Sequence, residues 1–234
     1  MRVLAIIPAR KGSKGIQNKN MQLLNQLPLV EHTIQAAHNT KDFDEIWISS
    51  DDNRILAIGA KYGLNIIERP QELASDEASA NDVVSHFLSK LPSNLDKKNT
   101  VIAYLQPTSP LRNSMHIQEA IEAMKEKSYT SSISVVKLNK SPYKSFLINP
   151  INGELSSLFD ERLSNKRRQD LQDAFIPNGA MYIFSIHDFE SRGGFPSNGS
   201  LPYIMSRDDS IDIDSEQDLN RANDILQDKI SSNS

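Results

Sequence analysis

The sequence contains no cysteine and no long hydrophobic run among its 234 residues. Without cysteine, the chain can form no disulfide, no zinc knuckle and no cysteine nucleophile. A membrane-spanning helix needs about eighteen or more consecutive apolar residues, and no such run is present. The N-terminal residues also lack the pattern of a signal peptide. We therefore expect a cytoplasmic protein that is not inserted in a membrane.

The sequence also lacks a strong excess of either charge. It carries 26 Lys and Arg against 30 Asp and Glu, a formal net charge of −4, so its surface as a whole is not one that attracts nucleic acid. Its 38% hydrophobic and 24% charged residues are typical of a chain that folds around a core. Against this background, a local cluster of cations is informative.

Short apolar runs and helical patterns occur along the chain, and they alternate regularly over residues 1–137. Strands are predicted at residues 3–7, 45–49, 65–68, 101–105, 132–136, 180–184 and 203–205. Helices are predicted around residues 27–37, 79–91 and 114–124 and from residue 215 onward, where apolar residues recur every three to four positions. Ser79 with Asp82 has the spacing of a helix capping box. The alternation predicts a three-layer α/β/α fold with a mostly parallel sheet, in a single domain over residues 1–234.

Residues 139–175 break this alternation. The segment is polar, holds Pro142 and Pro150, and contains a basic cluster at residues 166–168. It also carries apolar residues that need a partner surface: Phe146, Leu147, Ile148, Leu155, Leu158 and Phe159. We interpret residues 139–175 as a dimerisation arm that packs on a second subunit and favour this over a lid or hairpin on its own domain.

A basic loop with two glycines follows the first predicted strand. It contains four cations, namely Arg10, Lys11, Lys14 and Lys19. Ligands bind beyond the carboxyl ends of parallel strands, glycine lets backbone N–H groups approach an anion, and Lys and Arg neutralise its charge. The P-loop spacing and the dinucleotide fingerprint are both absent. The loop therefore predicts a polyphosphate site of another kind, with a solvated turn as the alternative.

Two further polar clusters are candidates for the same site. The stretch QPTSPLR, residues 106–112, follows a predicted strand and offers Gln106, while Arg112 is suited either to an anionic ligand or to a structural ion pair. Asp212 and Asp214 are two positions apart, so an extended segment places both carboxylates on one face, with Ile211 and Ile213 facing inward. Such a pair suits Mg²⁺; on its own it would equally fit solvated residues or a helix cap.

These motifs resemble those of the CMP–sialic acid synthetases, or acylneuraminate cytidylyltransferases, a family that includes enzymes activating legionaminic and pseudaminic acids. The segment IPARKGSKGIQNKN is similar to the pattern I-P-A-R-x-G-S-K-G-(I/V)-x-x-K-N, with Lys11 where Gly is common and Gln17 where Pro is common. Further motifs follow in the family's order: SDD from residue 50, RPQELASD from residue 69, QPTSPLR from residue 106, NGA from residue 178 and IDID from residue 211. The Kdo cytidylyltransferases have a shorter, differently spaced first loop and fit less well.

The resemblance implies that CTP and a nine-carbon α-keto acid sugar react to give the CMP-sugar and pyrophosphate. The implied CTP-binding residues are Ala9, Arg10, Gly12, Ser13, Lys14, Lys19, Asn20 and Ser79. The implied sugar-binding residues are Gln106, Arg112, Asn178 and Gly179, together with Lys144 and Arg168, which would reach from the arm across a homodimer. Asp212 and Asp214 would hold Mg²⁺, or Mn²⁺ in its place. Lys19, Asp214 and Arg10 are the implied catalytic residues, with Lys19 stabilising charge on the departing pyrophosphate.

Three alternative functions follow from the same residues. A Kdo or sugar 1-phosphate nucleotidyltransferase would differ in its substrates, and a non-catalytic nucleotide-binding protein would bind CTP without turnover. The intact acidic pair argues against the second. A dinucleotide-dependent oxidoreductase is disfavoured because the glycine fingerprint is missing.

Overall fold

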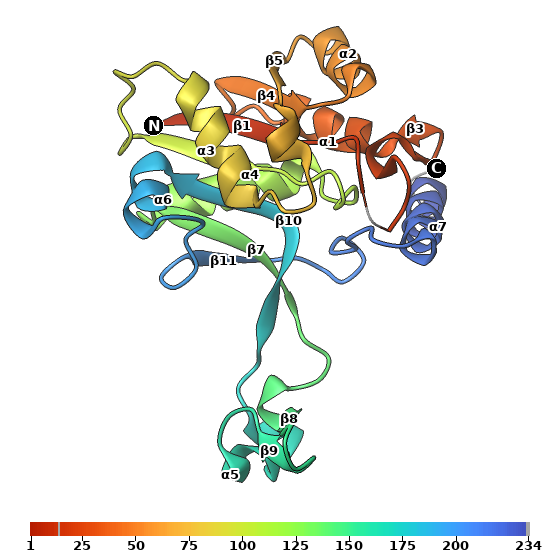
Figure 1. Cartoon of the computed structure of the whole chain (residues 1–234), viewed down its shortest axis with the longest axis vertical. Helices are drawn as coiled ribbons and strands as arrows, with labels where there is room; N and C mark the ends of the chain where they lie inside the picture. Colours follow the sequence, from red (N-terminus) through yellow and green to blue (C-terminus); the bar gives the residue numbers. More distant parts are fainter. Residues whose placement is uncertain (14, 233–234) are drawn as a thin grey trace.

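A seven-stranded sheet forms the centre of the protein, whose computed structural model describes residues 1–13 and 15–232 (Figure 1). In spatial order its strands are β11 (Leu201–Ile204), β7 (Ser131–Lys137), β10 (Phe175–Ser185), β6 (Thr100–Tyr104), β1 (Arg2–Pro8), β4 (Glu45–Ser50) and β5 (Asn65–Glu68). Neighbouring strands are parallel except where β10 pairs with β6 and with β7. The chain leaves the sheet after β7 and returns directly beside it as β10, so β10 must run antiparallel. The mostly parallel sheet is confirmed.

Helices cover both faces of this sheet. The α-helices are α1 (Leu29–His38), α2 (Asn53–Lys61), α3 (Ala80–Lys90), α4 (Ser114–Glu126), α5 (Glu161–Ser164), α6 (Ile186–Arg192) and α7 (Glu216–Ser232). Short 3₁₀ turns are η1 (Lys19–Met21), η2 (Gln71–Ala74), η3 (Pro142–Lys144) and η4 (Arg168–Asp170), and two small ribbons pair β2 (Leu23–Leu24) with β3 (Leu27–Pro28) and β8 (Phe146–Ile148) with β9 (Leu155–Ser157). No helix among the described residues has the length and apolarity needed to cross a bilayer.

The surroundings of strand β1 explain why its sequence is continuously apolar. Val3, Ala5 and Ile7 pack with α1, α2 and α4 on one face of the sheet, and Leu4 and Ile6 pack with α3 and α6 on the other. All five are essentially inaccessible to solvent. A strand buried on both faces has no position where a polar side chain is favoured, so the usual alternation disappears.

The helix starts follow local chemistry. The Ser79 hydroxyl accepts a hydrogen bond from the Asp82 N–H at 3.2 Å, and the Asp82 carboxylate accepts one from the Ser79 N–H at 2.9 Å, which confirms the capping box.

Helices α2 and α6 were not predicted. Both are short, and α2 includes Gly59, which favours helix poorly but leaves room for the Ile48 side chain.

A third, smaller core lies at the edge of the sheet where the strands β1 and β6 end. It is built from Ile16, Leu24, Leu29, Leu111, Ile211, Ile213 and Ala222, with Leu219, Ile225 and Leu226 of α7 packed against it. The basic loop, the 106–112 loop and the acidic segment each contribute to this cluster. Burying these side chains together fixes three loops, distant in sequence, beside one another.

The segment between β7 and β10 projects away from the sheet and carries β8, β9 and α5 at its far end (Figure 1). Its apolar side chains remain 45–94% exposed: Phe146, Leu147, Ile148, Ile151, Leu155, Leu158 and Phe159. A ring contact between Tyr143 and Phe159 and the β8–β9 ribbon hold the projection together, but its apolar residues are not covered by the rest of the chain.

Candidate active site

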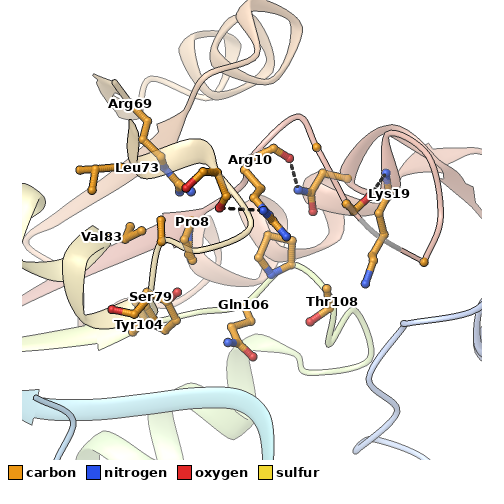
Figure 2. Close-up of a pocket in the computed structure, with 18 of the residues that line it drawn as sticks. Pro8, Arg10, Lys19, Arg69, Leu73, Ser79, Val83, Tyr104, Gln106 and Thr108 are labelled. Carbon is orange, nitrogen blue, oxygen red and sulfur yellow. Dashed lines mark hydrogen bonds between the residues drawn. The ribbon is translucent and has the colours of Figure 1, made fainter. Parts of the chain in front are cut away.

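A cavity of about 340 Å³ opens at the carboxyl ends of β1 and β6 (Figure 2). Eight residues of the predicted site are among its described lining: Arg10, Gly12, Ser13, Lys19, Asn20, Ser79, Gln106 and Asp214. The lining also includes Arg69, Tyr104 and the apolar residues Leu73 and Val83. One cleft is therefore shared by the basic loop, the start of α3, residues 106–108 and the acidic segment. Lys14, also predicted to bind CTP, lies outside the described residues.

Lys19 and Asp214 join the basic loop to the acidic segment. The Lys19 side chain is mostly buried, and its Nζ donates hydrogen bonds to the Ile213 carbonyl at 2.7 Å and to Asp214 Oδ1 at 2.8 Å. The Asp214 side chain is 77% exposed. The carboxylate therefore stays open to the cleft while it fixes the ammonium group at the cavity wall.

The basic loop is shaped by its own polar side chains. Asn20 Nδ2 donates to the Arg10 carbonyl at 2.8 Å, and Ser13 Oγ accepts from the Lys19 N–H at 3.3 Å while donating to the Ile16 carbonyl. Ala9 is buried, and its N–H donates to the Ser49 carbonyl at 2.9 Å on the neighbouring strand β4. These bonds hold the loop that presents Arg10 and Lys19 to the cavity.

Asp212 and Asp214 lie on the segment before α7, and Ile211 and Ile213, which alternate with them, are buried in the third core as predicted. Burial raises the pKa of Asp212; the Asp214 charge raises it further, and a hydrogen bond with Thr108 opposes this. Within the described residues, no group of three or more His, Cys, Asp or Glu could by itself hold a metal ion. A dication at this pair would need further oxygen ligands from a substrate.

Gln106 and Gly179 meet beside this acidic pair. Gly179 has φ of +77°, and a Cβ at this position would lie 2.7 Å from Gln106 Oε1 and 3.6 Å from Asp212 Oδ2. The backbone conformation favours glycine here, and a Cβ would also displace the Gln106 side chain. The turn at residues 178–179 therefore closes one side of the region around Gln106.

A family model described as "Cytidylyltransferase" matches residues 4–176. The chain belongs to this family. Among its relatives, the N-acylneuraminate cytidylyltransferase of Escherichia coli is 36% identical over 230 residues, covering 97% of this chain and 53% of the relative. The post-translational flagellin modification protein B of Campylobacter coli is 30% identical over 231 residues, covering 97% of this chain and 96% of the relative.

The chain spans about half the length of the N-acylneuraminate cytidylyltransferases that it matches. Solved structures of the same fold include CMP:2-keto-3-deoxy-manno-octonic acid synthetase complexed with CTP, with a TM-score of 0.70 and 14% identity over 98% of this chain and 100% of the other. Another is 4-diphosphocytidyl-2C-methyl-D-erythritol synthase from Anaerococcus prevotii, with a TM-score of 0.66 and 15% identity over 97% and 98%. Both likenesses establish the nucleotidyltransferase fold.

In this cytidylyltransferase-family protein, Asn178 is buried and its side chain is engaged within the protein. Its Oδ1 accepts hydrogen bonds from Ser134 Oγ at 2.6 Å and from the Ala180 N–H at 3.2 Å, and its Nδ2 donates to Ser210 Oγ at 2.8 Å. Asn178 thus ties β10 to β7 and to the segment before Asp212. In this geometry it shapes the site rather than presenting its amide to the cavity.

Arg112 is buried and does not occur in the described lining of the cavity. Its Nη2 donates to Thr33 Oγ1 of α1 at 2.6 Å, and no hydrogen-bond partner is found among the described residues for Nε or Nη1. Burial lowers the pKa of Arg112 to about 9. This geometry supports neither a sugar contact nor the alternative of a structural ion pair with a carboxylate.

Lys144 and Arg168 lie on the projecting segment, away from the cavity of their own chain (Figure 1). Lys144 Nζ donates to the Ser164 carbonyl at 3.2 Å, and Arg168 lines a separate hollow with Lys137 and Asp173 at the base of the projection. Within one chain, neither residue is brought to the site.

Three residues with no predicted role line or adjoin the cavity. Arg69 is buried, and its Nη2 donates to the Ser49 carbonyl at 2.9 Å. Tyr104 is hydrogen-bonded to Gln106, and burial raises its pKa to about 12. Asp76 forms an ion pair with Arg10 at 2.7 Å. The RPQELASD motif already contained Arg69 and Asp76, but nothing in the sequence placed this segment opposite the basic loop.

Proposed function

We propose that this protein transfers the cytidylyl group of CTP to a nine-carbon α-keto acid sugar of the sialic acid type, giving the CMP-sugar and pyrophosphate. The observation that carries the proposal is the contact of Lys19 with Asp214, which joins the basic loop to the acidic segment in one cleft. The names of the relatives at 36% and 32% identity support the same reaction. CTP is a nucleotide of the cell interior, so we also infer a cytoplasmic location.

In this reaction the anomeric hydroxyl of the sugar attacks the α-phosphorus of CTP, and the bond from that phosphorus to the pyrophosphate oxygen breaks. Catalysis of such transfers is mostly positioning and charge stabilisation. Arg10, Lys14 and Lys19 hold the triphosphate, assisted by the backbone of Gly12 and Ser13. Lys19 stabilises the negative charge that develops on the departing pyrophosphate, which is worth on the order of 10²–10³ in rate for a positioned donor.

Asp212 and Asp214 hold Mg²⁺, or Mn²⁺ in its place. The pair suits a dication because it offers two hard oxygen donors two positions apart, and a cation would offset the cost of charging Asp212, whose pKa is raised by burial and also by the Asp214 charge. When bound, the ion neutralises phosphate charge and favours ionisation of the sugar hydroxyl. Thr108, which hydrogen-bonds Asp212, orients that carboxylate.

The sugar acid lies beside Gln106 and Gly179, with Asn178 shaping this part of the site. We infer that residues 1–234 form a single domain in which residues 139–175 are a dimerisation arm. The exposed apolar side chains of the arm support this, because patches of this kind usually mark an interface. In the homodimer, the partner subunit's Lys144 and Arg168 complete the sugar site.

A substrate panel tests the proposal. The purified protein is given each of the four nucleoside triphosphates with sialic, legionaminic or pseudaminic acid, with Kdo, or with a sugar 1-phosphate, and pyrophosphate release is measured in the presence of Mg²⁺. Release only with CTP and a nine-carbon acid supports the proposal and identifies the sugar. Turnover only with Kdo or a sugar 1-phosphate overturns it, and CTP binding without any turnover would indicate a non-catalytic nucleotide-binding protein.

A further inference from the structure

The guanidinium of Arg10 is anchored through a single nitrogen. Its Nη1 donates to the Ser75 carbonyl at 2.9 Å and lies 2.7 Å from Asp76 Oδ1. Within residues 1–13 and 15–232, no hydrogen bond from Nε or Nη2 of Arg10 is found. The Nε–Nη2 edge, which is the edge best suited to a bidentate contact with phosphate, therefore remains available.

The anchor belongs to a different segment of the cavity lining. Ser75 lines the cavity and precedes α3, whereas Arg10 comes from the loop after β1, so the contact joins two parts of the lining that are 65 positions apart in the sequence. The ion pair is only partly shielded, with 30% of the Arg10 side chain and 47% of the Asp76 side chain exposed. Pairs of this kind add little to stability, so a stabilising role does not explain its place.

A second arginine makes a carboxylate at this place useful. Arg69 is buried in the same cavity lining; burial lowers its pKa, and the positive charge of Arg10 lowers it further. Two like charges in one cavity repel each other, and a flexible arginine would relieve this by turning outward to water. The contacts with Ser75 and Asp76 hold Arg10 inside instead.

We propose that Asp76 is a positioning residue for nucleotide binding: it fixes Arg10 through Nη1 so that the Nε–Nη2 edge faces the triphosphate before the nucleotide arrives. This inference rests on the proposed function, because it assumes that Arg10 contacts CTP. The benefit is preorganisation, since the freedom of a long side chain is lost before binding rather than during it. Asp76 itself makes no contact with the nucleotide.

A double-mutant cycle measured by calorimetry with CTP and Mg²⁺ tests the inference. We expect Asp76→Asn to raise the Kd for CTP about fivefold to tenfold in the presence of Arg10, and to change it by less than about twofold in the Arg10→Ala background. Asp76→Glu should recover much of the affinity. Glu77→Gln, which removes the same charge from the next residue of this exposed loop, is the matched control and should bind as the wild type does. Thermal unfolding of all variants should stay close to that of the wild type.

Three outcomes would overturn the inference. The first is an equal effect of Asp76→Asn on the Kd for CTP with and without Arg10. The second is a Kd of Asp76→Asn that equals the Kd of the control Glu77→Gln. The third is tighter CTP binding by Asp76→Asn, which would mean that Asp76 competes with the phosphate for Arg10. The proposed function fails separately, if the wild type does not bind CTP or if Arg10→Ala leaves the affinity unchanged.

Discussion

The backbone of Gly15 lies so close to the carbonyl oxygen of Asp214 that a Cβ on Gly15 would overlap that oxygen. Next to this contact, Lys19 Nζ donates to Asp214, a residue 195 positions away in the sequence. The basic loop and the acidic segment therefore touch through backbone as well as through charge. Gly15 of the basic loop permits this close approach because it has no Cβ, in addition to any contact that it makes with phosphate.

Gly15→Ala is expected to separate the two loops and to lower kcat/KM by about 100-fold, because small displacements of reacting groups are costly. The measurement is pyrophosphate release under saturating and limiting CTP, with circular dichroism as the check on folding. Gly12→Ala is the informative comparison, since a Cβ there would meet nothing within 4 Å, and it should lose much less. Equal activity of Gly15→Ala and wild type would show that the loops need not touch.

Asp214→Asn is expected to lower kcat by at least about 100-fold while the melting temperature changes little. The side chain is 77% exposed, so it contributes little burial, and its charge is needed chiefly for the reaction. Asp208→Asn removes an exposed carboxylate from the same segment and is the matched control. Wild-type turnover by Asp214→Asn in Mg²⁺ would remove Asp214 from the proposed metal site.

Much of this architecture could be predicted from the sequence. Strand β1 was identifiable because both of its faces are buried, and α3 because Ser79 and Asp82 form a capping box. Parallel strands end at the same edge of a sheet, which made a shared cleft for the basic loop and Gln106 a reasonable expectation. These features depend on local patterns that leave a clear trace in the residues.

The remaining features depend on contacts between distant residues. Helices α2 and α6 were missed because nine- and seven-residue helices leave little periodicity. For Arg112 the sequence left open an anionic ligand or a structural ion pair, because nothing in its own motif indicates that it turns inward to Thr33 of α1. Asp76 was visible in a motif, but its ion pair with Arg10 joins two loops that are distant in the sequence.

Leu147→Asp is expected to convert a homodimer to monomers, because it places a charge among the exposed apolar residues of the arm. Sedimentation or light scattering measures the mass, and sugar-dependent turnover should fall with it if the partner's arm completes the site. Leu23→Asp is the control: Leu23 is also exposed, at 62%, but lies on β2, which pairs with β3 and not with the arm. A wild-type monomer, or a variant dimer with full activity, would contradict the proposed role of the arm.

The free energy of unfolding is expected to rise with pH in the range just below 6.5. Burial lowers the pKa of His32, His86 and His116 from the ordinary value of 6.5, so in this range the unfolded chain binds more protons than the folded one. Urea unfolding at about pH 7.5 and about pH 5.5 measures the change. His32→Gln should flatten it, by less than about 1 kcal/mol because the ring is only partly shielded, with exposed His187→Gln as the comparison. A wild-type stability that falls with rising pH here would contradict the prediction.

Arg112→Met is expected to keep or increase stability, although it removes a fully buried side chain. The guanidinium makes one hydrogen bond, to Thr33, and has no carboxylate partner among the described residues, so burying its charge is costly and an apolar group of similar length should be tolerated. Arg112→Ala, which leaves a cavity as well, should lose about 2 kcal/mol or more. Denaturant unfolding compares the two variants, and a large loss in Arg112→Met would show that the charge is compensated within the fold. Pyrophosphate release by Arg112→Met then decides its role: activity close to wild type, with an unchanged KM for the sugar, would mean that this arginine only fills space behind the 106–112 loop.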